Sequence, residues 1–220
     1  MSERPPLLHR FYARLFRVWR AQRMRLFMQK IRPVEGDRIL DVGGSPSFWE
    51  DCRVRGLQII CLNRDPAFQE NPSHRRERGV TRVYGDGCEL TYPDQSFSIG
   101  FSNSVIEHVG TWERQKAFAR EILRVGRRIW VQTPAYECPL EPHFLAPGFH
   151  WLPQSWRKKL ARNFTLWGWM ERPSPGRAAA MVDEIRLLRK QEVEELFPGC
   201  KILTEKLWGV FPKSYIAIRR

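Results

Sequence analysis

The sequence contains no pair of closely spaced cysteines. Its five cysteines stand at positions 52, 61, 88, 138 and 200, without a Cys-x-x-Cys motif. This spacing argues against a disulfide framework and against a cysteine-bound metal. No run of histidines or carboxylates has the spacing typical of a zinc or magnesium site, so we expect no metal.

Long apolar runs are also missing. No stretch approaches the roughly 18 consecutive apolar residues that cross a bilayer, and the N-terminal residues lack the apolar core of a secretory signal. With 220 residues, 42% of them hydrophobic, the chain can form one main domain with some additions. We therefore expect a cytoplasmic globular protein.

Acidic residues are fewer than basic residues, and the excess of basic residues is unevenly distributed along the chain. The chain has 37 Lys and Arg against 24 Asp and Glu, a formal net charge of +13. Nine of the basic residues lie within 1–32, where Glu3 is the only acid. At about 100° per residue, arginines oppose an apolar arc of Leu8, Phe11, Leu15, Val18, Trp19 and Leu26. Residues 1–33 are predicted to form a basic amphipathic helix, followed by a main domain over 34–220.

Several interpretations of this helix remain open. It packs on the core with a solvated basic face, or it lies on an anionic membrane surface. Contact with nucleic acid is less favoured, because no added RNA-binding module is apparent. An Arg-rich, acid-poor segment is also compatible with an organelle transit peptide.

Residues 38–50 (RILDVGGSPSFWE) combine a short apolar strand, a glycine turn and a predicted helix start. This order is typical of nucleotide-binding α/β domains, where glycines let the ligand approach the backbone. The dinucleotide form of the turn needs a small residue where Phe48 stands, which argues against NAD. Asp41, before the turn, suits a ligand with a cationic or amino group.

The α/β alternation continues along the chain. Further strands are predicted at 56–62, 80–84, 96–101, 128–132, 202–210 and 215–219, with a helix over 111–125 that Thr111 caps. The pattern predicts a doubly wound, seven-stranded, mostly parallel sheet with helices on both faces. Ligands bind such sheets at the carboxyl ends of the strands, where the strand order reverses.

The first four strands all end in polar groups. These are Asp41, Asn63, Asp86 and the pair Asn103-Ser104. The segment GDGCELTYPDQSFSIGFSNSVIEHV (85–109), placed after DVGG, resembles class I S-adenosylmethionine-dependent methyltransferases of the quinone C-methylase-like group (methyltransferase type 11 domain). The resemblance covers about residues 36–134 and implies a Rossmann-like methyltransferase fold with S-adenosylmethionine as cofactor.

The resemblance assigns cofactor-binding roles to nine residues: Asp41, Gly43, Gly44, Ser45, Asn63, Asp86, Gly87, Ser102 and Asn103. It implies that Asp41 orients the methionine amino group and that Asp86 accepts from the adenine amino group. The sequence departs from the family pattern in two ways. Ser45 and Ser47 replace loop glycines, and Asn63 replaces the acid that binds the ribose, unless Asp65 is its equivalent. An amide lacks the charge assistance of a carboxylate, so cofactor binding weaker than usual is expected.

A base is needed only where the methyl acceptor must lose a proton, since the sulfonium already activates the methyl group. His108 ends the fourth-strand motif, and His143 lies with Glu141 in a loop predicted over the pocket mouth. Tyr136 is a weaker alternative. For His108, a structural role under the cofactor is the favoured interpretation. For His143, an ordinary solvated loop is an equally open interpretation.

An aromatic and basic insertion is predicted at about 135–176. Within 144–170, four of the nine tryptophans alternate with lysines and arginines, which suits either a cap over the site or docking at a membrane surface. We expect methyl transfer to a small or lipid-like acceptor, with a possible location on the cytoplasmic membrane face. An RNA methyltransferase is the second hypothesis, and a non-catalytic membrane- or nucleic-acid-binding relative is the third.

Overall fold

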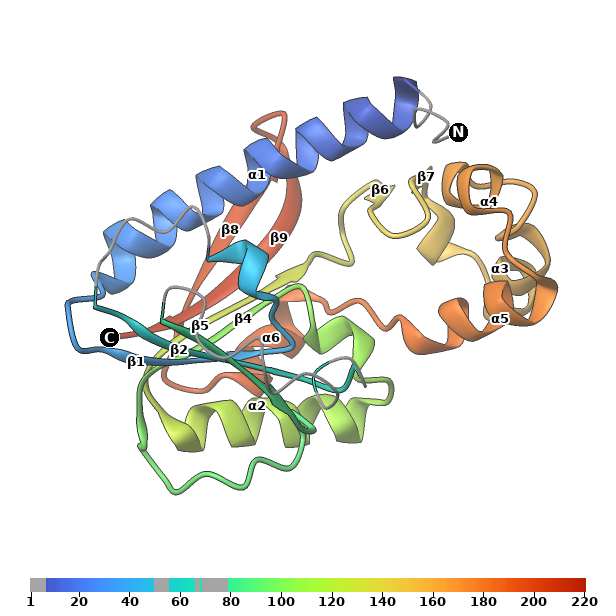
Figure 1. Ribbon diagram of the computed structural model, residues 1–220. Helices are drawn as coiled ribbons and strands as arrows, with labels where there is room; N and C mark the ends of the chain where they lie inside the picture. Colours follow the sequence, from blue (N-terminus) through green and yellow to red (C-terminus); the bar gives the residue numbers. More distant parts are fainter. Residues whose placement is uncertain (1–6, 50–55, 66–67, 69–78) are drawn as a thin grey trace, which may run out of the picture.

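The computed structural model describes residues 7–49, 56–65, 68 and 79–220, and in residues 7–17 it describes the backbone alone. A seven-stranded sheet forms the centre of the molecule, in the order β3-β2-β1-β4-β5-β9-β8 (Figure 1). Every neighbouring pair is parallel except those that β9 makes with β5 and β8. The predicted seven-stranded, mostly parallel α/β fold is confirmed.

The elements follow the predicted order closely. The sheet strands are β1 (Arg38–Val42), β2 (Gln58–Asn63), β3 (Val80–Tyr84), β4 (Phe97–Asn103), β5 (Gly126–Pro134), β8 (Lys201–Leu207) and β9 (Phe211–Arg219). The helices are α1 (Leu7–Ile31), α2 (Trp112–Val125), α3 (Gln154–Leu160), α4 (Leu166–Glu171), α5 (Pro175–Glu184) and α6 (Lys190–Leu196). A small hairpin pairs β6 (Leu140–Glu141) with β7 (Ala146–Pro147). The strand predicted at 202–210 ends at Leu207, because positive φ angles at Trp208 and Gly209 turn the chain into β9.

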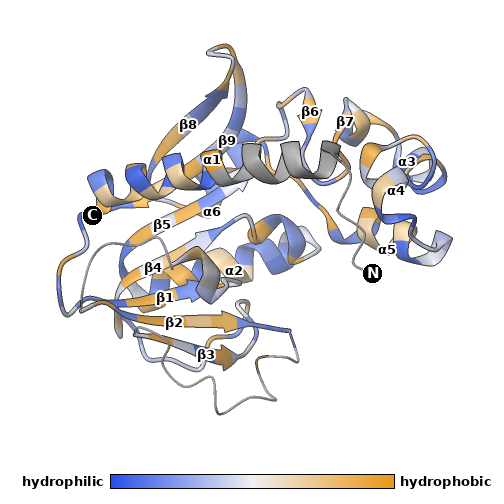
Figure 2. Cartoon of the chain, turned by 45° about the horizontal axis from the view of Figure 1, so that its top comes forward, coloured by the Kyte–Doolittle hydropathy of each residue, from blue (hydrophilic) through white to orange (hydrophobic). Residues whose placement is uncertain are grey.

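The central strands are buried because they are almost continuously apolar. Figure 2 shows β1, β4 and β5 as mostly hydrophobic, as parallel strands covered on both faces require. The chain passes from β3 back past β1 to β4, so β1 and β4 are neighbours at the point where the strand order reverses. The carboxyl ends of these two strands are therefore the expected ligand site.

Helices α2 and α6 cover one face of the sheet (Figure 1). The Thr111 side chain accepts a hydrogen bond from the Arg114 backbone N–H, which caps α2 as predicted. Phe118 and Ile122 of α2 are fully buried against the strands. This packing fixes the loop between β4 and α2, which carries His108.

Helix α1 covers the other face of the sheet (Figure 1). Its buried side chains are Met24, Phe27 and Ile31, and Phe27 packs edge-on against Phe101 of β4. These residues lie outside the predicted apolar arc, of which Val18 is 52% exposed. The second half of α1 thus packs on the core mainly through a face that the amphipathic pattern did not indicate, although Trp19 and Leu26 of the predicted arc also pack against the core.

The chain between β5 and α6 forms a separate small layer at one end of the sheet (Figure 1). It contains the β6–β7 hairpin, α3, α4 and α5, and it has its own apolar cluster around Phe144, Phe149 and Val182. The predicted insertion at 135–176 lies in this layer, which continues through α5. Among the described residues, no helix combines the length and the apolarity needed to cross a bilayer.

Candidate active site

Two cavities open side by side at the carboxyl ends of the strands. The first has a volume of about 490 Å³ and lies over β1, β2 and β3. The second has a volume of about 390 Å³ and lies between α1, β5 and β9. Ser104 and His108 line both cavities. The loop after β4 is therefore the wall that the two cavities share.

The glycine loop forms the floor of the first cavity. Gly43 has a φ of +80°, and a Cβ there would lie 2.4 Å from a Val105 methyl group, so a larger residue does not fit. The Asn63 amide donates to the carbonyl oxygens of Gly43 and Gly44, at 3.1 and 3.2 Å. Asn63 therefore holds the loop as well as lining the cavity, a role that a carboxylate without N–H groups would not perform.

Asp41 lies beneath this loop and does not line the first cavity. Its side chain is 1% exposed, and its Oδ2 accepts a hydrogen bond from the Trp49 indole N–H at 2.7 Å. Burial raises the pKa of Asp41 to about 7, although the hydrogen bonds from Trp49 and the Cys61 thiol oppose this shift. A Cβ on Gly44 would fall 1.8 Å from the Asp41 carboxylate. Asp41 thus supports the loop from below.

The other predicted cofactor residues divide between lining and support. Asn63, Asp86, Gly87 and Gly43 line the first cavity, whereas Asn103 lines the second. Ser102 is fully buried and donates to the Val42 carbonyl oxygen. Neither cavity is lined by Gly44 or Ser45. Of the helix expected after the turn, the structure describes a single 3-10 turn at Pro46–Phe48. Residues 50–55 lie outside the described residues.

Asp86 is bound from two sides. Its Oδ1 accepts from the Cys88 backbone N–H, and its Oδ2 accepts from the Arg114 guanidinium at 2.8 Å. Partial burial alone would raise its pKa, but the bonds from Arg114 and Cys88 outweigh burial and lower it. Each carboxylate oxygen has a second lone pair, so Asp86 can still accept from a ligand amino group. Asp65, the alternative ribose residue, donates its backbone N–H to Asn63 Oδ1 and does not line the cavity.

The second cavity is basic. Arg20 and Arg23 of α1 and Lys213 of β9 line it. Arg23 bonds to Glu205 and to the Asn103 side chain, which connects α1 to the ends of β8 and β4. Burial lowers the pKa of Lys213, partly offset by Glu205, which lies 3.8 Å away. Three cations and no carboxylate are among its lining residues, which favours an anionic occupant.

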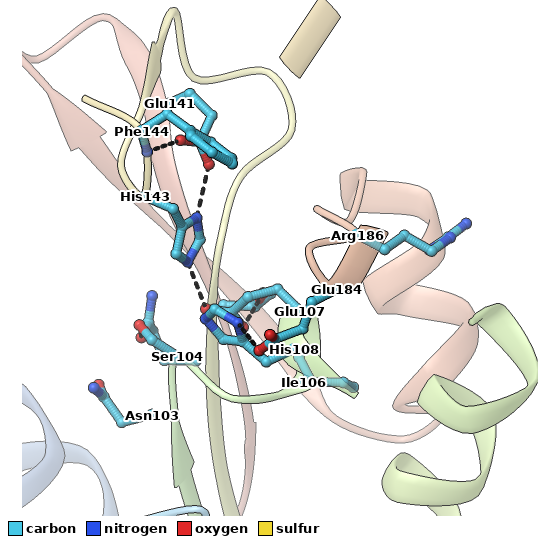
Figure 3. Close-up of polar contacts among 12 residues, drawn as sticks. Asn103, Ser104, Ile106, Glu107, His108, Glu141, His143, Phe144, Glu184 and Arg186 are labelled. Carbon is cyan, nitrogen blue, oxygen red and sulfur yellow. Dashed lines mark hydrogen bonds and ion pairs between the residues drawn. The ribbon is translucent and has the colours of Figure 1, made fainter. Parts of the chain in front are cut away.

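Two histidines meet at the boundary between the cavities. The rings of His108 and His143 pack edge-to-face with centroids 4.7 Å apart. His143 lies between Glu141, whose Oε1 is 2.7 Å from its Nδ1, and Glu107, whose Oε1 is 3.8 Å from its Nε2 (Figure 3). Burial alone would lower the pKa of His143, but Glu141 first, followed by Glu107, raises it.

His108 is held in a similar way by a residue that the sequence analysis missed. Its Nδ1 lies 3.0 Å from Oε1 of Glu184, at the end of α5 (Figure 3). Glu107 was also missed, although it is fully buried and accepts from the Thr133 hydroxyl. The repeated Glu and His pairing, at 107–108 and at 141–143, was a signal that could have indicated this cluster. Tyr136, the weaker alternative, packs against His150 and lines neither of the two cavities.

Comparison with known proteins agrees with this geometry. The family model described as a methyltransferase domain matches residues 40–128, which contain the glycine loop, Asp86 and the shared wall. Residues 40–128 are therefore similar to methyltransferase domains. A comparison with curated proteins finds no match.

Solved structures show the same fold at low sequence identity. A Rhodobacter sphaeroides protein described as a zinc-dependent alcohol dehydrogenase has a TM-score of 0.60 at 15% identity, with 89% of this chain and 88% of that chain covered. The PH0226 protein of Pyrococcus horikoshii has a TM-score of 0.55 at 15% identity, with 92% and 89% covered. Phosphoethanolamine N-methyltransferase 2 of Haemonchus contortus has a TM-score of 0.51 at 14% identity. That match covers 84% of this chain, which spans 38% of the length of the Haemonchus enzyme.

The residues of the first cavity fit S-adenosylmethionine. Its volume lies in the range of about 300–1,000 Å³ that holds small ligands and cofactors. The close approach of Gly43 to Val105 leaves backbone rather than side chain at the floor. Asp86 and Asn63 supply hydrogen-bond acceptors at neighbouring strand ends. The bound cofactor would supply an activated methyl group.

Proposed function

We propose that the enzyme transfers the methyl group of S-adenosylmethionine to a small or lipid-like acceptor that carries an anionic group and binds in the second cavity. The observation that carries this proposal is the shared wall of Ser104 and His108 between a cofactor-sized cavity and a basic one. Methyl transfer needs donor and acceptor in line at about 3–3.5 Å. The two cavities lie on either side of Ser104 and His108, so the loop after β4 sets how closely donor and acceptor approach.

The reaction itself requires little from the protein beyond the alignment of the methyl donor and the acceptor. An electron pair on the acceptor forms a bond to the methyl carbon, and the carbon–sulfur bond breaks with its electron pair left on sulfur. The products are the methylated acceptor and S-adenosylhomocysteine. A proton lost by an acceptor hydroxyl or amine passes to solvent or to a nearby base. The His108 and His143 rings, at the boundary, lie where the acceptor's nucleophilic atom is expected.

The sequence motif supports a narrower assignment. Residues 85–109 resemble the quinone C-methylase-like group, and we propose that the enzyme belongs to this group. An enzyme of this family group would suit an acceptor with two parts. Its anionic end would lie in the second cavity, and its ring or chain would extend toward the apolar cluster around Phe144 and Phe149. A non-catalytic relative would fail to bind S-adenosylhomocysteine, which calorimetric titration of the full chain measures.

The charge of the acceptor can be tested with a matched pair of variants. Arg20 and Arg25 are exposed residues of the same helix, but only Arg20 lines the second cavity. In a radiolabelled methyl-transfer assay, acceptors with a phosphate or carboxylate should be methylated in preference to neutral analogues. R20Q should raise the KM for such an acceptor about tenfold, or about 1.4 kcal/mol, and leave S-adenosylhomocysteine affinity unchanged.

R25Q serves as the control and should leave both quantities unchanged. Equal KM values for R20Q, R25Q and the unaltered enzyme would contradict the proposal, as would a preference for neutral acceptors. Preferred methylation of RNA over every small acceptor would favour the RNA methyltransferase hypothesis.

A second proposal concerns a membrane surface. Trp156, Phe164 and Trp169 are 60%, 70% and 66% exposed in the small layer, and basic residues including Lys159 and Arg162 lie among them. Exposed aromatic and basic side chains together suit the headgroup level of an anionic bilayer. We propose that this layer, together with the basic residues of 1–32, contacts such a surface on the cytoplasmic side.

Vesicle flotation tests this contact. Binding to phosphatidylglycerol vesicles should exceed binding to phosphatidylcholine vesicles, fall at high salt, and drop several-fold in W156A/F164A. Binding that is equal for both lipids, or unchanged in the double variant, would contradict the proposal. Tighter, salt-sensitive binding to RNA would favour nucleic acid as the partner instead.

A further inference from the structure

Glu107, His108 and His143 form a compact cluster at the boundary between the two cavities. One potential ligand atom from each lies within 4.8 Å of the other two. Donor atoms around a bound transition metal lie about 3–4 Å apart, so small side-chain rotations would bring the three into range. The residues come from the end of the β4 loop and from the loop after β5, two segments that the sheet pairing holds together.

The buried carboxylate of Glu107 gives the cluster an unsatisfied acceptor. Its Oε2 accepts from the Thr133 hydroxyl at 3.1 Å, but its Oε1 has no hydrogen-bond partner, although the residue is 0% exposed. An unpaired buried carboxylate oxygen is costly. Oε1 points toward His143, whose Nε2 is 3.8 Å away (Figure 3). A cation at this point would satisfy the oxygen.

Both histidines are oriented as metal ligands usually are. Nδ1 of His143 is bound by Glu141, and Nδ1 of His108 is bound by Glu184. In metal sites, a carboxylate on one ring nitrogen fixes the imidazole and leaves the other nitrogen for the ion. The same arrangement occurring twice, around a third buried carboxylate, is not needed for packing alone.

We propose that Glu107, His108 and His143 bind one divalent transition-metal ion. Two imidazole nitrogens and one carboxylate oxygen suit ions such as Mn²⁺, Co²⁺ or Zn²⁺, whereas Mg²⁺ and Ca²⁺ prefer oxygen ligands alone. The three protein ligands leave coordination positions open toward the cavities. Glu141 and Glu184 are positioning residues that act through the two rings.

The role of the ion rests on the proposed function, whereas its binding does not. At the boundary, the ion can coordinate an oxygen of the acceptor and favour its ionised form as the proton leaves to solvent. The ionised acceptor then attacks the methyl group as described above, through this oxygen or through a neighbouring atom that the oxygen activates. The substrate class narrows to acceptors with a hydroxyl or carboxylate oxygen near the methylated atom.

Ion binding can be measured without any acceptor. Full-length protein is treated with EDTA, exchanged into buffer and titrated with Mn²⁺ alone, and the free ion is followed by electron paramagnetic resonance. One equivalent should bind. E107Q keeps an oxygen for Thr133 and removes the ligand charge, so it should weaken Mn²⁺ binding about 100-fold or more. H143Q should weaken it to a similar extent.

His150 provides the matched control. It is a buried histidine of the same layer, its Nε2 lies 2.7 Å from the Tyr136 carbonyl oxygen, and it is outside the cluster. H150Q should bind Mn²⁺ as the unaltered protein does. Thermal unfolding and S-adenosylhomocysteine titration establish that each variant is folded. If E107Q is unfolded, H143Q alone carries the test.

The outcomes separate the two proposals. No stoichiometric uptake of Mn²⁺, Co²⁺ or Zn²⁺, or uptake that folded E107Q and H143Q do not change, would overturn the metal site. Methyl transfer that survives EDTA unchanged would leave a histidine as the base and remove the role of the ion. If the protein binds one equivalent of Mn²⁺ and the ligand variants weaken this binding as expected, but no methyl transfer is detected, the metal site stands and the proposed function fails.

Discussion

The two cavities are built in opposite ways. Nearly all of the first cavity comes from residues 42–118, from successive strand ends in chain order. The second combines residues 19–23 of α1, the loops after β4 and β5, and residues 213–214 of β9. The first cavity has glycines and short polar side chains at its strand ends, next to apolar and charged side chains, whereas the second is lined by Arg20, Arg23 and Lys213. The cofactor side therefore depends on backbone shape, and the acceptor side on distant parts of the chain held together.

This contrast predicts that the cofactor side is the more easily damaged by small changes. A Cβ at Gly44 would lie 1.8 Å from the buried Asp41 carboxylate, so the loop must move in G44A. S-adenosylhomocysteine affinity should fall about 100-fold, or about 3 kcal/mol, in calorimetric titration. G176A is the control, because a Cβ there meets nothing within 4 Å at the start of α5. An affinity in G44A within threefold of that in G176A would show that the loop is not the cofactor floor.

Replacement of Asp41, the buried acid beneath the same loop, should give the next largest effect, which is on the free energy of unfolding. The pKa of Asp41 in the folded protein is about 7, against the ordinary value of 3.8 for an aspartate, so between these values the folded protein keeps a proton that the unfolded chain releases. The contribution of Asp41 to stability is therefore fully present below about pH 4 and is lost as the pH rises to about 7. D41N, which stays neutral, should stabilise the protein at pH 8 by roughly 2–4 kcal/mol and have little effect at pH 4.

Urea unfolding at both pH values measures this difference, and the same variant tests the role of Asp41 toward the cofactor. If Asp41 only supports the loop from below, D41N should change S-adenosylhomocysteine affinity by less than about threefold. A tenfold loss in folded D41N would instead indicate direct contact with the methionine amino group. Equal stability changes at pH 4 and pH 8 would contradict the raised pKa.

The same division explains what the sequence could predict. Strands β1 to β5 and the Thr111 cap follow from local patterns. Of the nine predicted cofactor positions, Gly43, Asn63, Asp86 and Gly87 line the first cavity, because strand ends in a parallel sheet meet at one edge. The contribution of α1 to the acceptor cavity could not be predicted. Burial of Met24 and Phe27 depends on which face of the helix fits the sheet, whereas the amphipathic pattern indicated the arc with Val18. The pairing of His108 with Glu184, 76 residues away, likewise depends on where the small layer folds back.

The smallest change in ligand binding is expected for a variant at the boundary between the two cavities. Glu184 lines the first cavity and binds His108 of the shared wall, but its side chain is 55% exposed. Solvent screens such a contact, so E184Q should weaken Mn²⁺ binding only about threefold and leave S-adenosylhomocysteine affinity within error. E171Q, an exposed acid elsewhere in the layer, is the control for a change of surface charge. If E184Q instead weakens the cofactor and spares the ion, His108 acts on the cofactor side, and the boundary between the two cavities lies nearer to His143.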